Sequence, residues 1–327
     1  MTPRDVPQEV VIEAAPGCNF SCPGCFNRAS FASETRSIRG MSSEFIREVL
    51  GSVRSAGIPQ VRFTGGEALS RPDIIELMEH ARNLGLRVWL NTNATLVKPS
   101  NAARICSVAD NILVQFNGHD EASDLDWTHT AGSFARKLRG VALLREAGAR
   151  FIRAGTALTP RNLENLELIF KVVRAAKVDD WEVYRPVELA PGEVPLDVPT
   201  LVRKLAVLSV AFEKPVSIAN PMPFCAGDVE TLPLFCSAPG SESNHQRIFI
   251  DPRGFAKPSY YINEDLGDPR DILSCWNHPF MKKMRDLQMV PDACRSCAHL
   301  VQCRGGSRYA AFLHHGSYDA RDPLMKS

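Results

Sequence analysis

Three cysteines near the N-terminus have the spacing of a metal-binding loop. Cys18, Cys22 and Cys25 form a C-x3-C-x2-C run directly after an apolar, strand-like segment. Such a loop supplies three thiolates, one fewer than the four that saturate an iron–sulfur cube. One iron would then keep an open position at which an outside ligand can bind, as in catalytic zinc sites. The alternative is a zinc loop, although zinc sites usually read as paired C-x2-C units.

A second motif follows another short apolar segment, at residues 61–63. Thr64, Gly65, Gly66 and Glu67 stand directly after it, and glycines allow the backbone to approach a ligand closely. The two motifs, in this order, resemble those of the radical S-adenosylmethionine (SAM) superfamily.

This resemblance implies a set of cofactors and a reaction. Cys18, Cys22 and Cys25 would hold a [4Fe–4S] cluster whose open iron binds SAM, and the residues at 64–67 would bind the methionine amino group. An electron from an external donor such as flavodoxin or ferredoxin would pass through the cluster and cleave SAM. The deoxyadenosyl radical so released would abstract a hydrogen atom from a substrate.

Further SAM contacts are expected from four positions that match the family less closely. Asn93 lies in a segment that resembles the third-strand turn of the family, and Gln115 stands where a ribose-binding serine is common. His129 falls near a position where an arginine often meets the SAM carboxylate. Arg153 on the fifth strand, like Arg185 on the sixth, could bind a carboxylate bidentately, or could be an ion-paired structural residue.

A second cysteine group lies near the C-terminus. Cys294, Cys297 and Cys303 form C-x2-C-x5-C before a glycine pair, which resembles the SPASM or twitch extensions that carry auxiliary [4Fe–4S] clusters. Residues 248–259 resemble the hairpin of such an extension. Three further cysteines of a full extension are replaced here, by Ser259, Ser307 and Met325. We therefore expect one auxiliary cluster, the alternative being a zinc knuckle or a degenerate remnant.

Four cysteines remain outside both groups. Cys106 is expected to be a buried small hydrophobic residue. Cys236 matches the first cysteine of the extension and is favoured as a cluster ligand. Cys225, and after it Cys275, are the candidates for a catalytic thiol that donates a hydrogen atom to a substrate radical.

The pattern of apolar segments predicts the elements that carry these residues. Strands are expected at 10–13, 60–63, 86–91, 111–116, 151–158 and 180–187, and helices at 42–55, 72–83, 100–107, 134–147, 163–176 and 200–212. Alternating strands and helices indicate a parallel sheet with right-handed crossovers. The fold class is α/β and resembles the partial (β/α)6 TIM-like barrel of radical SAM enzymes. We expect a barrel domain at 8–213 and a cysteine-bearing extension at 214–327.

Composition limits the cellular context and the partners. The chain has 327 residues, 23% of them charged, and a formal net charge of +1. This balance gives no reason to expect nucleic acid or a membrane surface as a partner. The sequence has no signal segment and no apolar run of 18 residues, so a cytoplasmic protein is expected.

The function expected is hydrogen-atom abstraction from a natural-product substrate. A sugar or other small molecule is favoured over a peptide, because the chain begins close to its first strand. Epimerisation would use a cysteine as hydrogen donor. The alternative is dehydrogenation or peptide modification with the auxiliary cluster as electron acceptor, and a more remote one is a non-catalytic iron–sulfur carrier or sensor.

Overall fold

The computed structural model describes residues 5–25, 40–187, 196–236 and 246–325. Within these residues, nine strands form a single sheet in the order β7-β6-β5-β4-β3-β2-β1-β8-β9. The strands are β1 (Glu9–Ala15), β2 (Gln60–Gly65), β3 (Arg87–Thr92), β4 (Asn111–Gln115), β5 (Ile152–Ala157), β6 (Asp180–Tyr184), β7 (Val216–Ile218), β8 (Arg247–Ile250) and β9 (Ala256–Lys257). Neighbouring strands are parallel except β8 and β9.

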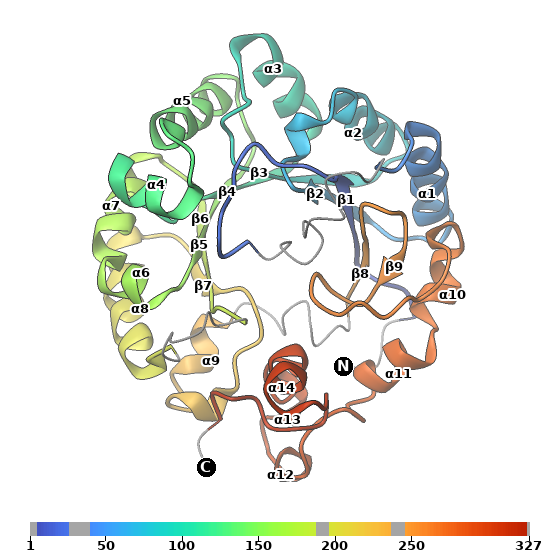
Figure 1. The fold of residues 1–327 in the computed structure, drawn as a ribbon, viewed down its shortest axis with the longest axis vertical. Helices are drawn as coiled ribbons and strands as arrows, with labels where there is room; N and C mark the ends of the chain where they lie inside the picture. The colour runs from blue at the N-terminus through green and yellow to red at the C-terminus, as the bar shows by residue number, and fades with distance from the viewer. Residues whose placement is uncertain (1–4, 26–39, 188–195, 237–245, 326–327) are drawn as a thin grey trace.

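Helices follow most strands and cover the outside of the curved sheet (Figure 1). Along the first part of the chain they are α1 (Ser43–Ser55), η3 (Ala68–Ser70), α2 (Ile74–Asn83), α3 (Pro99–Val108), α4 (Glu121–Thr128), α5 (Ser133–Glu146), α6 (Pro160–Glu164), α7 (Leu166–Ala175) and α8 (Val198–Phe212). The later helices are η4 (Phe224–Ala226), α9 (Leu232–Phe235), η6 (Pro269–Asp271), α10 (Ile272–Trp276), α11 (Pro279–Arg285), α12 (Asp292–Arg295), α13 (Leu300–Cys303) and α14 (Arg308–His315).

The predicted barrel is confirmed. Each of the six expected strands is present, and consecutive strands β1 to β6 are parallel neighbours. β1 and β2 are buried along their whole length, because helices cover one face and the barrel interior the other. The carboxyl ends of these strands point to one end of the barrel, where parallel-barrel enzymes carry their chemistry.

The C-terminal part of the chain extends the same sheet. β7 pairs with β6 at one end, while β8 pairs with β1 at the other, and β8 and β9 form the expected hairpin. The helices α9 and α14 lie between the two ends of the sheet (Figure 1). The domain division at 213/214 stays a prediction, although the sheet continues across it.

Two details of the predicted helices are wrong. The helix expected from residue 163 begins earlier: Thr159 caps α6 by accepting a hydrogen bond from the Asn162 backbone N–H at 3.1 Å. The helix expected at 163–176 is interrupted at Asn165, where α6 ends and α7 begins. The helix α4 was not predicted at all.

Other helix ends form as their residue types require. The Ser42 hydroxyl caps α1 by accepting a hydrogen bond from the Phe45 backbone N–H at 3.1 Å. Gly57, Gly85 and Gly148, each just past a helix, have a left-handed backbone, with φ of +73°, +80° and +80°. In the described part of the chain, no helix is both long enough and apolar enough to cross a membrane.

Candidate active site

The start of the first cysteine loop is hydrogen-bonded to the glycine motif at the end of β2. The backbone N–H of Gly66 donates to the Ala15 carbonyl at 2.8 Å, and that of Glu67 donates to the Gly17 carbonyl at 2.9 Å. A Cβ atom at Gly66 would lie 2.0 Å from the Gly17 carbonyl oxygen. Gly65 has a φ of +136°. The glycines are therefore required by the contact between the two motifs themselves.

Glu67 connects the end of β2 to the end of β3. Its carboxylate is 1% exposed and accepts hydrogen bonds from the Thr92 hydroxyl at 2.6 Å, the Asn93 backbone N–H at 2.6 Å and the Leu69 backbone N–H at 3.0 Å. Burial raises the pKa of this carboxyl group, and the three hydrogen bonds oppose that rise. These contacts hold the turn after β3 against the glycine motif.

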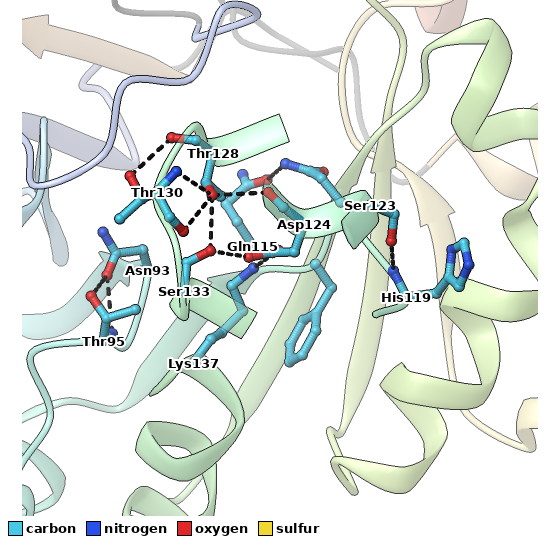
Figure 2. Close-up of polar contacts among 12 residues, drawn as sticks. Asn93, Thr95, Gln115, His119, Ser123, Asp124, Thr128, Thr130, Ser133 and Lys137 are labelled. Atoms are coloured by element: carbon cyan, nitrogen blue, oxygen red, sulfur yellow. Dashed lines mark hydrogen bonds and ion pairs between the residues drawn. The ribbon is translucent and has the colours of Figure 1, made fainter. Parts of the chain in front are cut away.

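Asn93 and Thr95 extend this connection to the cysteine loop. The Asn93 side chain donates to the Asn19 side-chain oxygen at 2.7 Å, and Asn19 donates to the Thr95 hydroxyl at 2.9 Å. Figure 2 shows Asn93 and Thr95 joined by their own hydrogen bonds. On the other side of the loop, the Ser21 backbone N–H donates to the Thr128 carbonyl at 3.1 Å. The cysteine loop is thus held from β2, β3 and α4.

The three thiols of this loop interact with one another. Burial, together with the nearby Cys25 and Cys18, raises the pKa of Cys22 to about 12. Burial likewise raises the pKa of Cys18 to about 11. Because these thiolates repel one another, the loop favours a cation that neutralises them together. The donor set and its setting therefore fit an iron–sulfur cluster.

The geometry also bears on the zinc alternative. Among the residues that the structure describes, no group of three or more His, Cys, Asp and Glu side chains is arranged to hold one metal ion. A cube binds each thiolate through a different iron, so its ligands need not converge on one point.

The weaker SAM candidates occupy different environments. Gln115 ends β4, is half-buried, and accepts a hydrogen bond from the Asn117 side chain at 3.3 Å, so it lies at the same end of the barrel as the glycine motif. His129 is exposed and ends α4 in a left-handed conformation, with a φ of +51°.

Arg153 lies near the start of β5, at the opposite end of the strand from the two motifs. Its guanidinium group pairs with Asp180 at 2.9 Å and with Glu182 at 2.6 Å, and lies 5.1 Å from the centre of the Trp89 ring. Arg153 is therefore an ion-paired structural residue, which was the alternative expected from the sequence. We do not propose that it contacts SAM. Arg185 is likewise paired, with Asp322 at 2.7 Å.

The C-terminal cysteines gather around Cys303. The Cys294 thiol interacts electrostatically with Cys303, Cys225 and Cys297, and Cys236 interacts with Cys303. Burial raises the pKa of the Cys303 thiol. The Phe224 backbone N–H donates to the Cys303 sulfur at 3.4 Å. Cys225, expected as a hydrogen donor, therefore lies beside the auxiliary triplet.

The two serines that replace expected cysteines are part of local structure. The buried Ser307 hydroxyl caps α14 by accepting from the Ala310 backbone N–H at 3.0 Å. The buried Ser259 hydroxyl accepts from the Tyr261 and Ile262 backbone N–H groups at 3.1 and 3.0 Å.

Cys275 and Cys106 are both buried in the core. The Cys275 thiol, in α10, donates to the Asp268 carbonyl at 3.3 Å, and α10 packs on α1 on the outside of the sheet. Because α10 is outside the barrel, we do not carry Cys275 forward as a hydrogen donor. The Cys106 thiol donates to the Leu144 carbonyl at 3.4 Å between α3 and α5, which confirms the prediction of a buried residue.

Comparison with known proteins identifies the family of this domain. Residues 12–173 match the radical SAM superfamily, and this span contains the cysteine loop and the glycine motif. The chain carries a radical SAM domain. It is therefore an enzyme whose family uses a [4Fe–4S] cluster and SAM, and its C-terminal cysteines are consistent with an auxiliary cluster.

Relatives of this radical SAM enzyme span almost the whole chain. It is 25% identical over 337 residues to an AdoMet-dependent heme synthase of Oleidesulfovibrio alaskensis, which covers 95% of this chain and 85% of the relative. It is 25% identical over 346 residues to a PqqA peptide cyclase of Gluconobacter oxydans, which covers 99% of this chain and 92% of the relative.

Solved structures share the fold of this radical SAM enzyme. Streptococcus suis SuiB bound to SAM matches with a TM-score of 0.80 and 19% identity, over 99% of this chain and 78% of SuiB. The anSMEcpe structure with bound AdoMet matches with a TM-score of 0.74 and 19% identity, over 97% of this chain and 93% of the other.

Sequence reasoning missed a buried ion pair beside the cysteine loop. Asp124 on α4 and Lys137 on α5 form an ion pair close to the cysteine loop, and both are buried. The sequence signal for α4 was available: Asp120 and Ser123 form a capping box at its start. The burial of Lys137 had no such local signal.

Proposed function

We propose that this radical SAM enzyme oxidises a side chain of a peptide, with a C-terminal auxiliary cluster as electron acceptor. When bound, SAM and the two clusters would supply the redox chemistry: one hydrogen atom leaves the substrate with the deoxyadenosyl group, and an electron and a proton follow to the auxiliary cluster and to solvent. An external one-electron donor is needed for SAM cleavage. The net change in the substrate is the loss of two hydrogen atoms.

The contact between Phe224 and Cys303 is the observation that carries this proposal. It holds the segment that contains Cys225 against the C-terminal triplet. There the rings of Phe224 and His299 also pack edge to face, with their centres 6.1 Å apart. A thiol that belongs to this group supports an auxiliary cluster with a fourth protein ligand. In this proposal Cys225 serves as a cluster ligand and not as the hydrogen donor that epimerisation requires.

The substrate class is supported by the relatives. The name PqqA peptide cyclase describes a peptide substrate for one relative, and SuiB and anSMEcpe have been solved with bound peptides. A sugar, which was favoured from the sequence, has no such support. The AdoMet-dependent heme synthase relative supports a tetrapyrrole as the second candidate substrate.

Within the proposed function, Cys18, Cys22 and Cys25 hold the SAM cluster. The carboxylate of Glu67 fixes the turn that carries Asn93, so that the backbone of the glycine motif is oriented for the methionine group of SAM. Gln115 stays a candidate contact of the ribose, and His129 an exposed candidate near the carboxylate.

The auxiliary ligands can be tested without a substrate. We propose Cys225, Cys294, Cys297 and Cys303 as the ligand set, with Cys236 as the competing fourth ligand. Cys225→Ser and Cys236→Ser would be purified anaerobically, with Cys106→Ala as the control for loss of an unrelated buried thiol. Iron and sulfide analysis with Mössbauer spectroscopy should show an altered auxiliary cluster in Cys225→Ser alone. An unchanged spectrum in Cys225→Ser, with a change in Cys236→Ser, would assign the fourth position to Cys236.

The reaction is tested with the whole protein. Reconstituted enzyme would be incubated without oxygen with SAM, dithionite and a library of synthetic peptides of defined sequence. We expect 5′-deoxyadenosine and a peptide that is lighter by two hydrogen atoms, with no deuterium incorporated in D2O. A peptide of unchanged mass in H2O that gains one deuterium in D2O would instead indicate epimerisation. If a porphyrin precursor loses mass and no peptide does, the tetrapyrrole candidate replaces the peptide.

A further inference from the structure

A buried ion pair lies next to the cysteine loop. Lys137 is 2% exposed and Asp124 is fully buried, and the ammonium nitrogen lies 2.5 Å from a carboxylate oxygen. The ammonium group is also 5.9 Å from the centre of the Phe116 ring. The cost of removing two charges from water offsets most of their attraction, so such a pair adds little net stability. Its position therefore points to a role other than holding α4 and α5 together.

Hydrogen bonds extend from this pair toward the cysteine loop, and Figure 2 shows those among Lys137, Asp124, Ser133 and Thr128. The Ser133 hydroxyl bonds the other carboxylate oxygen of Asp124 and lies 2.8 Å from the Thr128 hydroxyl. The Thr128 hydroxyl donates to the Asp124 carbonyl at 2.8 Å. The Thr128 carbonyl in turn accepts from the Ser21 backbone N–H, at 3.1 Å. Ser133 and Thr128 thus connect the ion pair to the loop that carries the thiols.

The loop also packs directly on α4. A Cβ atom at Gly24 would lie 3.1 Å from the Trp127 ring, so this part of the loop rests on the indole. Trp127 and Thr128, which contact the loop, lie about one helical turn beyond Asp124 in α4. The ion pair is therefore fixed to the part of α4 that holds the cysteine loop.

We infer that Lys137 is a positioning residue that holds a positive charge against the SAM cluster and makes the cluster easier to reduce. Reduction adds one negative charge to the cluster, and a nearby buried cation stabilises the more negative state. Asp124 fixes the ammonium group in place and limits the size of the effect. The inference rests on the proposal that Cys18, Cys22 and Cys25 hold this cluster.

The test is a redox titration of the reconstituted full-length protein, followed by electron paramagnetic resonance. The signal that changes when SAM is added identifies the SAM cluster and separates it from the auxiliary one. Lys137→Met removes the cation and should shift the reduction midpoint of the SAM cluster to a lower potential. At a fixed applied potential, the fraction of reduced cluster should then be several-fold smaller than in the wild type. Asp124→Asn leaves the cation without its counter-charge and should shift the midpoint in the opposite direction.

Arg145→Met is the matched control. Arg145 lies on the same helix, and its ion pair with Asp179 at 2.6 Å is at the far end of α5 from Asp124. Its midpoint should equal that of the wild type. If Lys137→Met does not assemble a cluster, the midpoints of Asp124→Asn and of the double variant Lys137→Met/Asp124→Asn test the inference instead.

Three results would overturn the inference. The first is an unchanged midpoint in the Lys137 variants that hold the cluster. The second is a shift of the same sign in Lys137→Met and Asp124→Asn, which a purely structural role would produce. The third is weaker SAM binding with no change in midpoint, which would assign the cation to the SAM carboxylate. A wild-type protein without a SAM-responsive cluster would instead contradict the assignment of the cysteine loop.

Discussion

At Gly66 the space for a side chain is occupied by the cysteine loop. The Cβ atom of an alanine there would lie 2.0 Å from the Gly17 carbonyl oxygen, far inside contact distance. The loop would have to move away from the end of β2. We therefore expect Gly66→Ala to lose the SAM-responsive cluster signal and SAM cleavage, while far-ultraviolet circular dichroism stays close to that of the wild type.

Gly51→Ala is the control for this substitution. Gly51 lies within α1, and a Cβ atom there would meet nothing within 4 Å. Alanine is favoured over glycine inside a helix by roughly 0.5–1 kcal/mol, so this variant should be slightly more stable and fully loaded with iron. Equal iron in the two variants would mean that the cysteine loop does not depend on the glycine contact.

At the level of elements, a buried carboxylate joins the start of β1 to its two neighbouring strands. Glu9 pairs with Arg62 of β2 at 2.8 Å and with Arg247 of β8 at 2.5 Å. Burial raises the pKa of Glu9, but the two arginines outweigh this effect and lower the pKa to about 2, from an ordinary value of 4.5. Because the pKa is depressed in the folded state, the stability from Glu9 is complete above pH 4.5 and is lost as the pH falls toward 2.

Glu9→Gln should remove this component of acid denaturation. We expect the variant to be less stable at pH 7 by roughly 3 kcal/mol, since two arginines lose their buried partner. Its free energy of unfolding should then change less than that of the wild type between pH 4.5 and pH 2. Chemical denaturation at several pH values measures both. Glu79→Gln, which breaks the exposed ion pair with Arg104 at 3.0 Å, is the control and should change little. Parallel pH curves for wild type and Glu9→Gln would contradict the argument.

The elements that the sequence predicts well are those whose signals are local. Apolar segments located β1 to β6, because the apolar residues that a buried strand needs are visible in the sequence whatever surrounds the strand. The cysteine loop and the glycine motif were predicted for the same reason.

What the sequence could not predict depends on contacts between distant segments. Cys225 lies beside the auxiliary triplet because residue 224 contacts residue 303, far along the chain. From the sequence alone, Lys137 is expected on the exposed face of an amphipathic helix. It is buried because Asp124 of α4, a helix that was not predicted, packs against it. Arg153 on β5 could equally face a ligand or an ion-pair partner until the carboxylates of β6 are known to be its neighbours.

For the whole molecule, the two cysteine groups should load iron independently. They lie in separate segments, and the wild type should carry two [4Fe–4S] clusters, or about eight irons per chain. Replacing Cys18, Cys22 and Cys25 together by alanine should abolish 5′-deoxyadenosine formation and leave about four irons at the C-terminal group. Iron analysis with a SAM cleavage assay measures both. Deoxyadenosine from the triple variant, zinc at the C-terminal group, or about twelve irons in the wild type would each contradict this assignment.

The pairing of β8 with β1 has a consequence for shortened forms of the protein. β1 is the first strand in the chain, yet it lies inside the sheet, because β8 covers the side of it that β2 does not. A chain that ended at residue 213 would leave a seven-residue, wholly buried strand with its backbone groups unpaired along one side. A long apolar edge of this kind is a template for joining other chains. The isolated barrel is therefore expected to aggregate, and the C-terminal cysteine region protects the solubility of the domain whose chemistry it is proposed to serve.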